Sequence, residues 1–511
     1  MSTAHSWTEL RSSGRDLASL LAFRRAGLTA SGHRRLRLMG LLVLALTVTA
    51  AVAPAYLGGD FPRKNSGNVL ALLPSASLAF LLLATFTAVA SAGGREVVPR
   101  DQAVAFPVSP TTDHLGALLL APLNIAWIMQ AWLLLGAASY ALGPSRVWAY
   151  EIPVLLWIVA ATALAQVAGW LAEGVRRGRH GIGIFRVLVV VFALALGSLI
   201  VTGRLAPVLD HSPTSRLLVL LLDTQAGYWW RWALGLLVLA AIGLAAVVVG
   251  AIPARWALQR PMREELRLES GHFPARPTAA SDFVMMLRID RAAVWRSVPL
   301  RRGMTVLAVM PGAVALAGDL EWRMLTVLPG LVASGGALLF GVNTWCLDGR
   351  GALWRDSLPV GPRTAFLSRV VVLMEVLLCS AALTLVLAAL RAGRPTVPEA
   401  VALLCSTIVV VVQVIAAGMR WSIARPFAVD LRSARATPAP PVVMAGYSAR
   451  LAVSTTFTGL AFSGLAELHD ARYAVCAAVV FLCWSGWRLL RATRRWEDPA
   501  VRARVVATVA G

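Results

Sequence analysis

Pro107-Val108-Ser109-Pro110-Thr111-Thr112 (the first loop) and Pro359-Val360-Gly361-Pro362-Arg363-Thr364 (the second loop) are two copies of one short segment. They lie 252 positions apart (107 to 359) in a chain of 511 residues, and each stands between two long apolar runs. Two prolines three residues apart cannot lie in the middle of a helix, because proline lacks the backbone N–H and clashes with the preceding turn. Each loop is therefore predicted to be a fixed turn between helices, and the repetition predicts two related halves.

The composition predicts a membrane protein. The chain is 58% hydrophobic and only 14% charged, whereas a soluble domain is about a quarter charged. Only helices and closed barrels satisfy their backbone in a bilayer, and no alternation typical of barrel strands is present. We predict an all-α polytopic membrane protein with about twelve transmembrane helices of ~20 residues. The predicted spans are 38–56, 68–92, 115–141, 153–173, 184–202, 233–252, 303–318, 324–345, 366–390, 399–419, 448–465 and 472–490.

The spans predict two parallel six-helix repeats. The first half covers 38–252 and the second 303–490, and an even number of spans in each half places both loops on the same, cytoplasmic side. Each half is preceded by a segment that mixes arginine with apolar residues, which predicts an amphipathic cytoplasmic helix. These segments are 1–37 and the later part of a basic linker, 253–302, and 491–511 is predicted to be a cytoplasmic tail.

The net charge of +22 does not indicate nucleic-acid binding. The basic residues cluster at span ends, as in Arg176-Arg177-Gly178-Arg179 and Arg494-Arg495. With both termini inside, most of them fall in cytoplasmic segments, as the positive-inside rule requires. We therefore predict a multi-pass protein of the cytoplasmic membrane with both termini cytoplasmic, whose basic residues meet lipid headgroups.

Catalytic motifs are absent from the sequence. It contains no G-x-x-x-x-G-K-[ST] phosphate loop, no H-E-x-x-H and no G-x-S-x-G, so we predict a chain that is not an enzyme and binds no metal or cofactor itself. The five cysteines have no metal-ligand spacing and are expected to be small buried apolar residues. His114 and His180 stand at predicted span ends, where we expect contact with solvent or headgroups.

Carboxylates are scarce within the predicted spans. Glu375 is the clearest one, and an ionisable residue at membrane depth is a candidate functional site. The alternative is a structural role, in which Glu375 reaches the interface or pairs with Arg369. A carrier driven by protons or sodium ions usually needs several such groups, so we expect the driving energy to enter at the cytoplasmic face, where the loops lie.

The loops have the properties of a lever. Proline fixes φ, so a push on the loop moves the adjoining helices instead of bending the turn. Arg355, Asp356 and Arg363 offer charged contacts to a soluble partner. The alternative is a turn that only joins two helices, and the occurrence of the loop at matching places in both halves favours coupling to a partner.

The segment from Phe340 to Pro362 resembles a known family. Its F-G-V-N-T-W-C-L-D-G-R-G stretch is similar to the N-x-F-x-x-D-G-x-G segment in the transmembrane subunit of type 2 ABC exporters, and Trp345 is the aromatic residue of that pattern here. The R-D-S-L-P-V-G-P stretch after it is similar to the coupling helix that follows in the same family. The first half matches more weakly, because the Asn and the D-G-x-G are missing. The resemblance implies coupling loops that dock on a separate ATP-binding subunit. The residues concerned are Arg100, Asp101, Pro107, Val108, Pro110, Asn343, Asp348, Arg355, Asp356, Pro359, Val360, Pro362 and Arg363.

The resemblance implies a fused permease that recruits two copies of the ATPase and exports a small lipophilic or amphipathic molecule, with ATP hydrolysed by the partner. We expect the second loop to make the principal contact, since 343–363 retains the fuller pattern. Two alternatives remain. One is a twelve-span secondary transporter, whose usual G-x-x-x-D-R-x-G-R-R loop is replaced here by GGREVVPRD. The other is a membrane scaffold that transports nothing.

Overall fold

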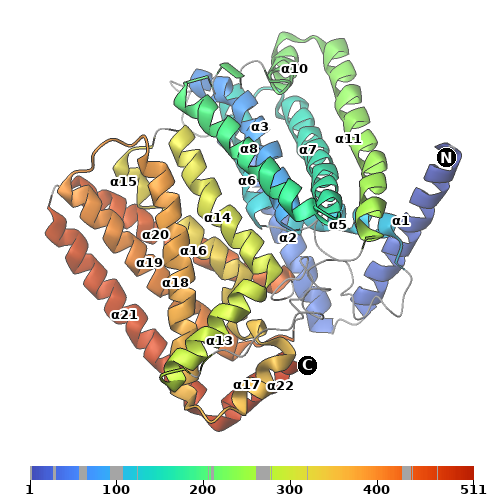
Figure 1. Ribbon diagram of the computed structural model, residues 1–511. Coiled ribbons are helices and arrows are strands. Elements are labelled where there is room, and N and C mark those ends of the chain that lie inside the picture. Colours follow the sequence, from blue (N-terminus) through green and yellow to red (C-terminus); the bar gives the residue numbers. More distant parts are fainter. Residues whose placement is uncertain are drawn as a thin grey trace. The chain divides into compact units, whose positions relative to one another are not determined.

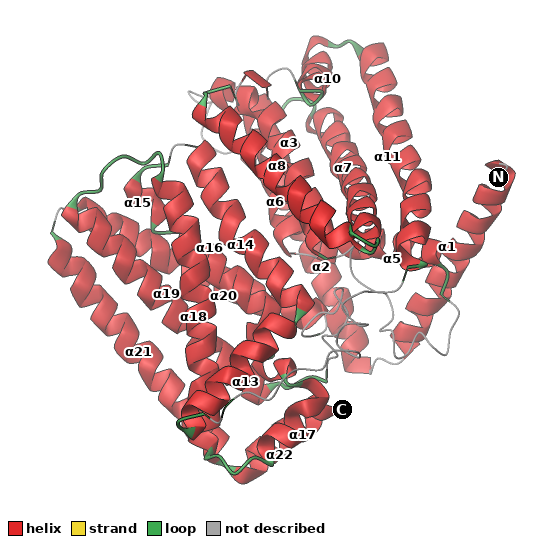
Figure 2. Ribbon diagram, in the orientation of Figure 1, coloured by secondary structure: helices red, strands yellow, loops and turns green. Residues whose placement is uncertain are grey.

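A computed structural model shows a helical protein (Figure 2). Helices and their connecting loops account for all the residues that the structure describes, and no strand occurs among them. The described residues are 3–26, 30–56, 66–91, 108–123, 125–204, 207–208, 212–260, 277, 279–318, 320–428, 439, 441–468 and 470–511.

Several of these helices are long and apolar enough to cross a bilayer, as the prediction of a polytopic membrane protein requires. Among the described residues there are eight: Ser66–Ala90, Val147–Arg176, Gly181–Leu199, Trp229–Leu258, Trp322–Gly341, Pro362–Ala389, Val397–Ala424 and Ala471–Glu497. They confirm an all-helical fold and are consistent with a multi-pass membrane protein.

The other four predicted spans, 38–56, 115–141, 303–318 and 448–465, are also largely helical but are not among these eight. The span 115–141 is not one continuous helix, because Pro122 lies in a 3₁₀ turn between two α-helices. Proline removes a helical hydrogen bond. Because the residues on both sides of Pro122 are apolar, hydrophobicity alone predicted one continuous span. A count of twelve spans stays a prediction.

The chain divides into two compact units, Met1–Glu269 and Ser270–Gly511. In the first unit, α7 packs along α3 and α11, and α6 packs on α3 (Figure 1). The core of this packing includes Leu135, Tyr150 and Ile158. Its elements are α1 (Thr3–Ala26), α2 (Ala30–Val52), η1 (Ala53–Ala55), α3 (Ser66–Ala90), α5 (Pro110–Leu120), η2 (Ala121–Leu123), α6 (Ile125–Leu142), α7 (Val147–Arg176), α8 (Gly181–Val201), α10 (Ser215–Ala226) and α11 (Trp229–Leu258).

In the second unit, α19 packs along α21, and α14 packs along α18 (Figure 1). A core around Phe340, Phe366 and Met419 joins these helices. The elements are α13 (Asp282–Arg296), α14 (Val298–Ala317), α15 (Trp322–Leu325), α16 (Leu328–Gly336), a π-helical turn η3 (Ala337–Gly341), η4 (Thr344–Leu347), η5 (Gly349–Gly351), α17 (Ala352–Asp356), α18 (Pro362–Ala389), α19 (Val397–Ala424), α20 (Pro441–Glu467), α21 (Ala471–Glu497) and α22 (Pro499–Ala510).

Both loops end at the first turn of a helix, as their prolines predict. Pro110 opens α5 and Pro362 opens α18, at a position where the missing N–H removes no helical bond. Ser109 caps α5 by accepting a hydrogen bond from the Thr112 N–H at 3.0 Å. Gly361 precedes α18 without a side-chain cap, so the two loops begin their helices by different means.

Candidate functional site: the second loop and its buried charges

The second loop is built on a segment where regular helix gives way to tight turns. The π-helical turn η3 ends at Gly341, and the chain then passes through η4, η5 and the short helix α17. Gly349 adopts φ +49°, a left-handed conformation that favours glycine, and this explains the glycine of the D-G-x-G pattern. Asn343 is buried, and its side-chain N–H donates to the Phe427 carbonyl at 2.8 Å. These contacts fix the segment that leads into the loop.

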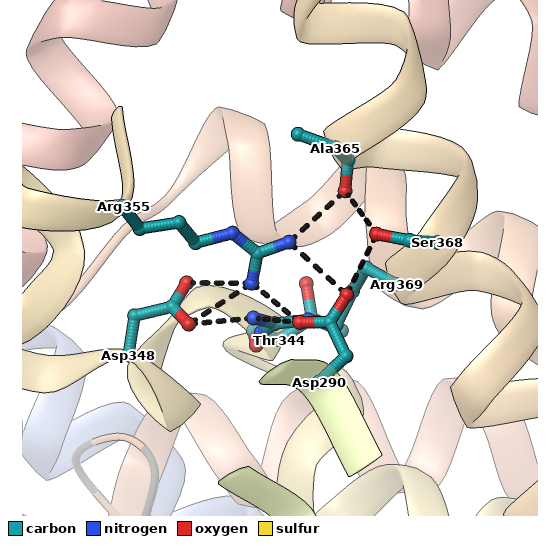
Figure 3. A network of polar contacts seen from close by, with 7 residues as sticks. All are labelled: Asp290, Thr344, Asp348, Arg355, Ala365, Ser368 and Arg369. Atoms are coloured by element: carbon teal, nitrogen blue, oxygen red, sulfur yellow. Dashed lines mark hydrogen bonds and ion pairs between the residues drawn. The ribbon is translucent and has the colours of Figure 1, made fainter. Parts of the chain in front are cut away.

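Four buried charges hold the second loop in place (Figure 3). Asp290 on α13 accepts hydrogen bonds from Arg369 Nε at 2.9 Å, Ser368 Oγ at 2.7 Å and Arg355 Nη2 at 3.1 Å. Asp348 accepts from the same two arginines, at 3.0 Å from Arg355 Nη1 and 2.6 Å from Arg369 Nη2. Two carboxylates and two guanidinium groups make a neutral cluster that joins α13, α17, α18 and the D-G-x-G turn.

Backbone carbonyls complete the cluster. Arg355 Nη2 donates to the Ala365 carbonyl at 3.1 Å, and Arg369 Nη1 donates to the Thr344 carbonyl at 2.5 Å. Arg369 is fully buried and Arg355 nearly so. A buried arginine is tolerated when its donors are paired with carboxylates and carbonyls, as they are here. Arg355 thereby connects α17 to the first turns of α18.

The protonation state of Asp290 follows from these contacts. Burial alone would raise the pKa of this carboxyl. The positive charges of Arg369 and Arg355, with hydrogen bonds from Arg355 and Ser368, outweigh burial and hold the pKa below its ordinary value. Asp290 is therefore a carboxylate at neutral pH, and the cluster stays charge-balanced.

An aromatic stack and the C-terminal helix border the same site. The rings of Trp345 and Trp496 stack at 3.9 Å between centroids, and the guanidinium of Arg369 lies 5.2 Å from the Trp345 ring. On α22, Arg502 pairs with Asp356 at 3.1 Å. A hollow between α22 and the second loop is lined by residues that include Trp345, Arg355, Val360, Trp496, Arg502 and Val506. The loop therefore rests on α22 as well as on α13.

The outer surface of α17 and of the second loop is exposed. Leu353 and Trp354 on α17 are each 59% exposed, and Asp356, Pro359 and Arg363 are also exposed. Val360 is half-buried and its N–H donates to the Leu358 carbonyl at 2.7 Å. The predicted coupling residues of the second unit thus differ in burial. Asn343, Asp348 and Arg355 are internal supports, Val360 and Pro362 are half-buried, and Asp356, Pro359 and Arg363 are exposed.

The first loop is held by hydroxyl groups and one ion pair. Ser13 on α1 lies 3.2 Å from Ser109, and Thr111 donates to Glu9 Oε1 at 2.9 Å. Glu9 also pairs with Arg255 on α11. Val108 and Pro110 lie at the start of α5 and are half-buried, whereas Arg100, Asp101 and Pro107 lie outside the described residues. The first unit therefore also places an N-terminal helix against its loop.

Sequence reasoning missed several residues of these sites. Asp290 stood in an arginine-rich segment and Arg369 at the start of an apolar run. His114 was expected to contact solvent or headgroups, and this was wrong: it is fully buried, accepts from Trp170 Nε1 at 3.0 Å and lies 3.1 Å from the Val247 carbonyl. A Cβ at Gly250 would lie 2.6 Å from the His114 ring, so the glycine makes room for it.

Glu375 does not pair as expected, and a second carboxylate at span level, Glu151, was not predicted. Glu375 pairs with Arg291 on α13, with Arg291 Nη2 at 2.6 Å from Oε1, and not with Arg369. Its side chain is 39% exposed, so it is a surface ion pair between two helices. Glu151, by contrast, is buried near the start of α7, and neither carboxylate oxygen has a hydrogen-bond partner.

The described part of the chain offers no obvious metal site. No group of three His, Cys, Asp or Glu side chains in it could hold a metal ion. Burial raises the pKa of the Cys346 thiol to about 12, which makes it a neutral packing group.

Comparison with protein-family models, with curated proteins and with solved structures found no match.

Proposed function

We propose that this chain is the permease of an ATP-driven exporter of the type 2 ABC kind, with both transmembrane halves in one polypeptide. A separate ATP-binding subunit, in two copies, would dock on the loops from the cytoplasm and hydrolyse ATP. The cargo would be a small lipophilic or amphipathic molecule that crosses the cytoplasmic membrane, and both chain termini would be cytoplasmic.

The geometry of the second loop is the observation that carries this proposal. The loop is exposed, begins α18 at Pro362 and is attached through Arg355 to Asp290 and Asp348. Force applied to such a loop passes to α18 and α13, because a proline-bracketed turn and a buried charge cluster resist bending. A turn that only joined two helices would not require a fully paired cluster behind it.

The exposed residues of α17 and of the second loop that follows it have the composition of a docking site. Leu353 and Trp354 offer apolar surface, and Asp356 and Arg363 beside them offer charges of both signs. Aromatic anchors surrounded by polar residues are typical of protein interfaces. A soluble ATPase with an apolar groove and a charged rim fits this surface.

The order of elements in each unit supports a repeat. Within the first unit α1 contacts α5 at the loop, and within the second α13 contacts α18 at the loop. In the first unit α7 packs along α11, and in the second unit α19 packs along α21. In both units an inner helix thus packs along the last long helix. These matched pairs favour two parallel copies of one fold.

The proposal is tested by binding of an ATPase. The full chain is co-expressed with the P-loop ATPase encoded nearest to it, purified, and assayed for the copurified subunit and for ATP hydrolysis. Replacing residues 359–362 with Gly and Ser is expected to abolish copurification and the stimulation of hydrolysis, since both the shape and the stiffness of the loop are lost.

The matched control replaces 392–395 with Gly and Ser at the opposite end of α18, where Gly393 already has φ +70°. This variant should bind and stimulate the ATPase as the unchanged chain does. Equal binding by both variants would contradict the coupling proposal.

Glu151 favours the secondary transporter as a second candidate. A buried carboxylate without a partner can take up a proton or a cation. If the chain is a proton-driven carrier, Glu151→Gln should abolish transport, and the unchanged chain should transport without any ATPase. If the chain is the permease, transport should survive Glu151→Gln and stop only when the ATPase is removed. A scaffold would transport nothing in either case.

A further inference from the structure

Three arginines lie on neighbouring helices of the second unit. Arg420 lies near the end of α19, Arg450 on α20 and Arg488 on α21, and these helices pack against one another. The charges of Arg420 and Arg450 both act on Arg488, so Arg488 lies within electrostatic range of each of them. None of them forms an ion pair or hydrogen bond within the described part of the chain. Like charges gathered without a counter-ion are unfavourable, so the cluster calls for an anion.

Buried donor groups border these arginines. The Nε–H of Arg488, the hydroxyl of Tyr447 and the Nε1–H of Trp421 are all buried without a hydrogen-bond partner. Tyr447 is 2% exposed, its ring lies 5.2 Å from the Trp421 ring, and the charge of Arg488 acts on it. Leaving a buried donor unpaired is unfavourable, because it has lost its hydrogen bond to water. An oxygen-rich anion would supply the missing acceptors.

The position of the cluster indicates an amphiphile. Arg450 lies nine residues after Pro441 and Arg488 nine residues before Glu497, which is roughly 13 Å from the helix ends at 1.5 Å per residue. On α20 the helical face of Arg450 continues through Val453, Phe457 and Leu460, which are 58%, 70% and 51% exposed.

On α21 exposed apolar residues lie on the side of the cluster away from the helix end. Val480 and Trp484 precede Arg488 by two and one helical turns and are 69% and 58% exposed. A molecule with its charged group on the arginines can therefore lay a hydrocarbon chain along both helices.

We infer that Arg420, Arg450 and Arg488 bind the phosphate of an anionic phospholipid, whose acyl chains lie along the exposed apolar faces of α20 and α21. Phosphate suits the forked guanidinium group, because two parallel N–H donors match two phosphate oxygens. Basic pockets between membrane helices are suited to such headgroups. Binding of such a lipid does not require the proposed ATPase.

The inference is tested with the purified full chain and phosphatidylglycerol, titrated by native mass spectrometry against phosphatidylcholine. The Arg450→Gln and Arg488→Gln variants are each expected to bind phosphatidylglycerol about tenfold more weakly, the loss of one charged hydrogen bond. The matched control is Arg491→Gln on the same helix, where Arg491 lies over the Trp487 ring, and it should bind as the unchanged chain does.

Thermal unfolding followed by tryptophan fluorescence separates a binding defect from a folding defect. In phosphatidylcholine alone, Arg450→Gln should melt no lower than the unchanged chain, since repulsion is relieved. Phosphatidylglycerol should raise the melting temperature of the unchanged chain and of Arg491→Gln, and hardly change that of Arg450→Gln.

A further arm adds inorganic phosphate or glycerol 3-phosphate to the protein in phosphatidylcholine. Little stabilisation is expected, because these ions lack acyl chains. If free phosphate stabilises the chain as well as the lipid does, the site is a soluble-anion site and the lipid inference is overturned. Equal binding of phosphatidylglycerol by all the variants would also overturn it.

Discussion

The two loops share their prolines but are held by different chemistry. In the first unit, Ser109 and Thr111 meet Ser13 and Glu9 of α1. In the second unit, α13 meets the loop through Asp290 and two buried arginines. At the spacing of 252 residues, Arg369 corresponds to Ala117, so the first loop has no place for the same cluster.

This difference assigns different mechanical properties to the loops. Hydroxyl bonds and a partly exposed ion pair are weak and rearrange easily. A buried cluster of four charges is strongly coupled, because removing one member leaves another unpaired. We therefore expect the second loop to move as one body with α13 and α18, and the first loop to yield more readily.

The largest effect is expected from Asp290→Asn. This change removes one negative charge and leaves Arg355 and Arg369 buried with Asp348 alone. The free energy of unfolding should fall by about 3 kcal/mol or more, measured by reversible unfolding in mixed micelles. The copurified ATPase should be lost in parallel, since Arg355 no longer holds α17.

A combined variant separates charge imbalance from general damage. Replacing Asp290, Asp348, Arg355 and Arg369 together by apolar residues of similar size should recover part of the stability, because no unpaired charge is left. Coupling to the ATPase should not recover. If Asp290→Asn unfolds as the unchanged chain does, the cluster is not the support of the second loop.

Acid should also lower the free energy of unfolding through the charge cluster behind the second loop, but by less than Asp290→Asn does. The pKa of Asp290 is lower in the folded protein than its ordinary value, so the carboxylate contributes its full stability above the unfolded pKa of about 3.9. That contribution is lost as the pH falls through the lower folded pKa. Unfolding measured between neutral pH and the acid range should show this loss in the unchanged chain. In Asp290→Asn the corresponding part of the acid dependence should be missing, and two parallel profiles would contradict the assignment.

The sequence predicted the loops and singled out two of the four charged residues, but as contacts for a partner and not as members of a buried cluster. Asp348 and Arg355 belong to a local pattern, so adjacent residues indicated them. Asp290 and Arg369 lie 58 and 21 positions away from Asp348 (290 and 369 against 348), and only tertiary packing brings them together. Asp290 is the lone carboxylate in a run rich in arginine, I-D-R-A-A-V-W-R. A single acidic residue on a helix predicted to be amphipathic was the signal that could have indicated a partner for buried arginines.

His114 shows the same limit in the first unit. Its place near a span end predicted exposure, but whether a helix end is covered depends on neighbouring helices. Here Trp170 on α7 and the approach of α11 at Gly250 enclose the ring. The sequence gives no measure of that approach, since a small residue in an apolar helix is compatible with either lipid or a close neighbour.

The smallest effect is expected from Glu9→Gln in the first unit. The side chains of Arg255 and Glu9 are 28% and 35% exposed, and such an ion pair contributes less than about 1 kcal/mol. A glutamine oxygen can still accept the Thr111 hydroxyl, so only the charge is lost. Raised salt should reproduce this small effect in the unchanged chain, because exposed charges are screened, and should leave the Asp290 cluster nearly unaffected. If Glu9→Gln destabilises the chain as much as Asp290→Asn does, the two loops are equally held and the asymmetry between them is wrong.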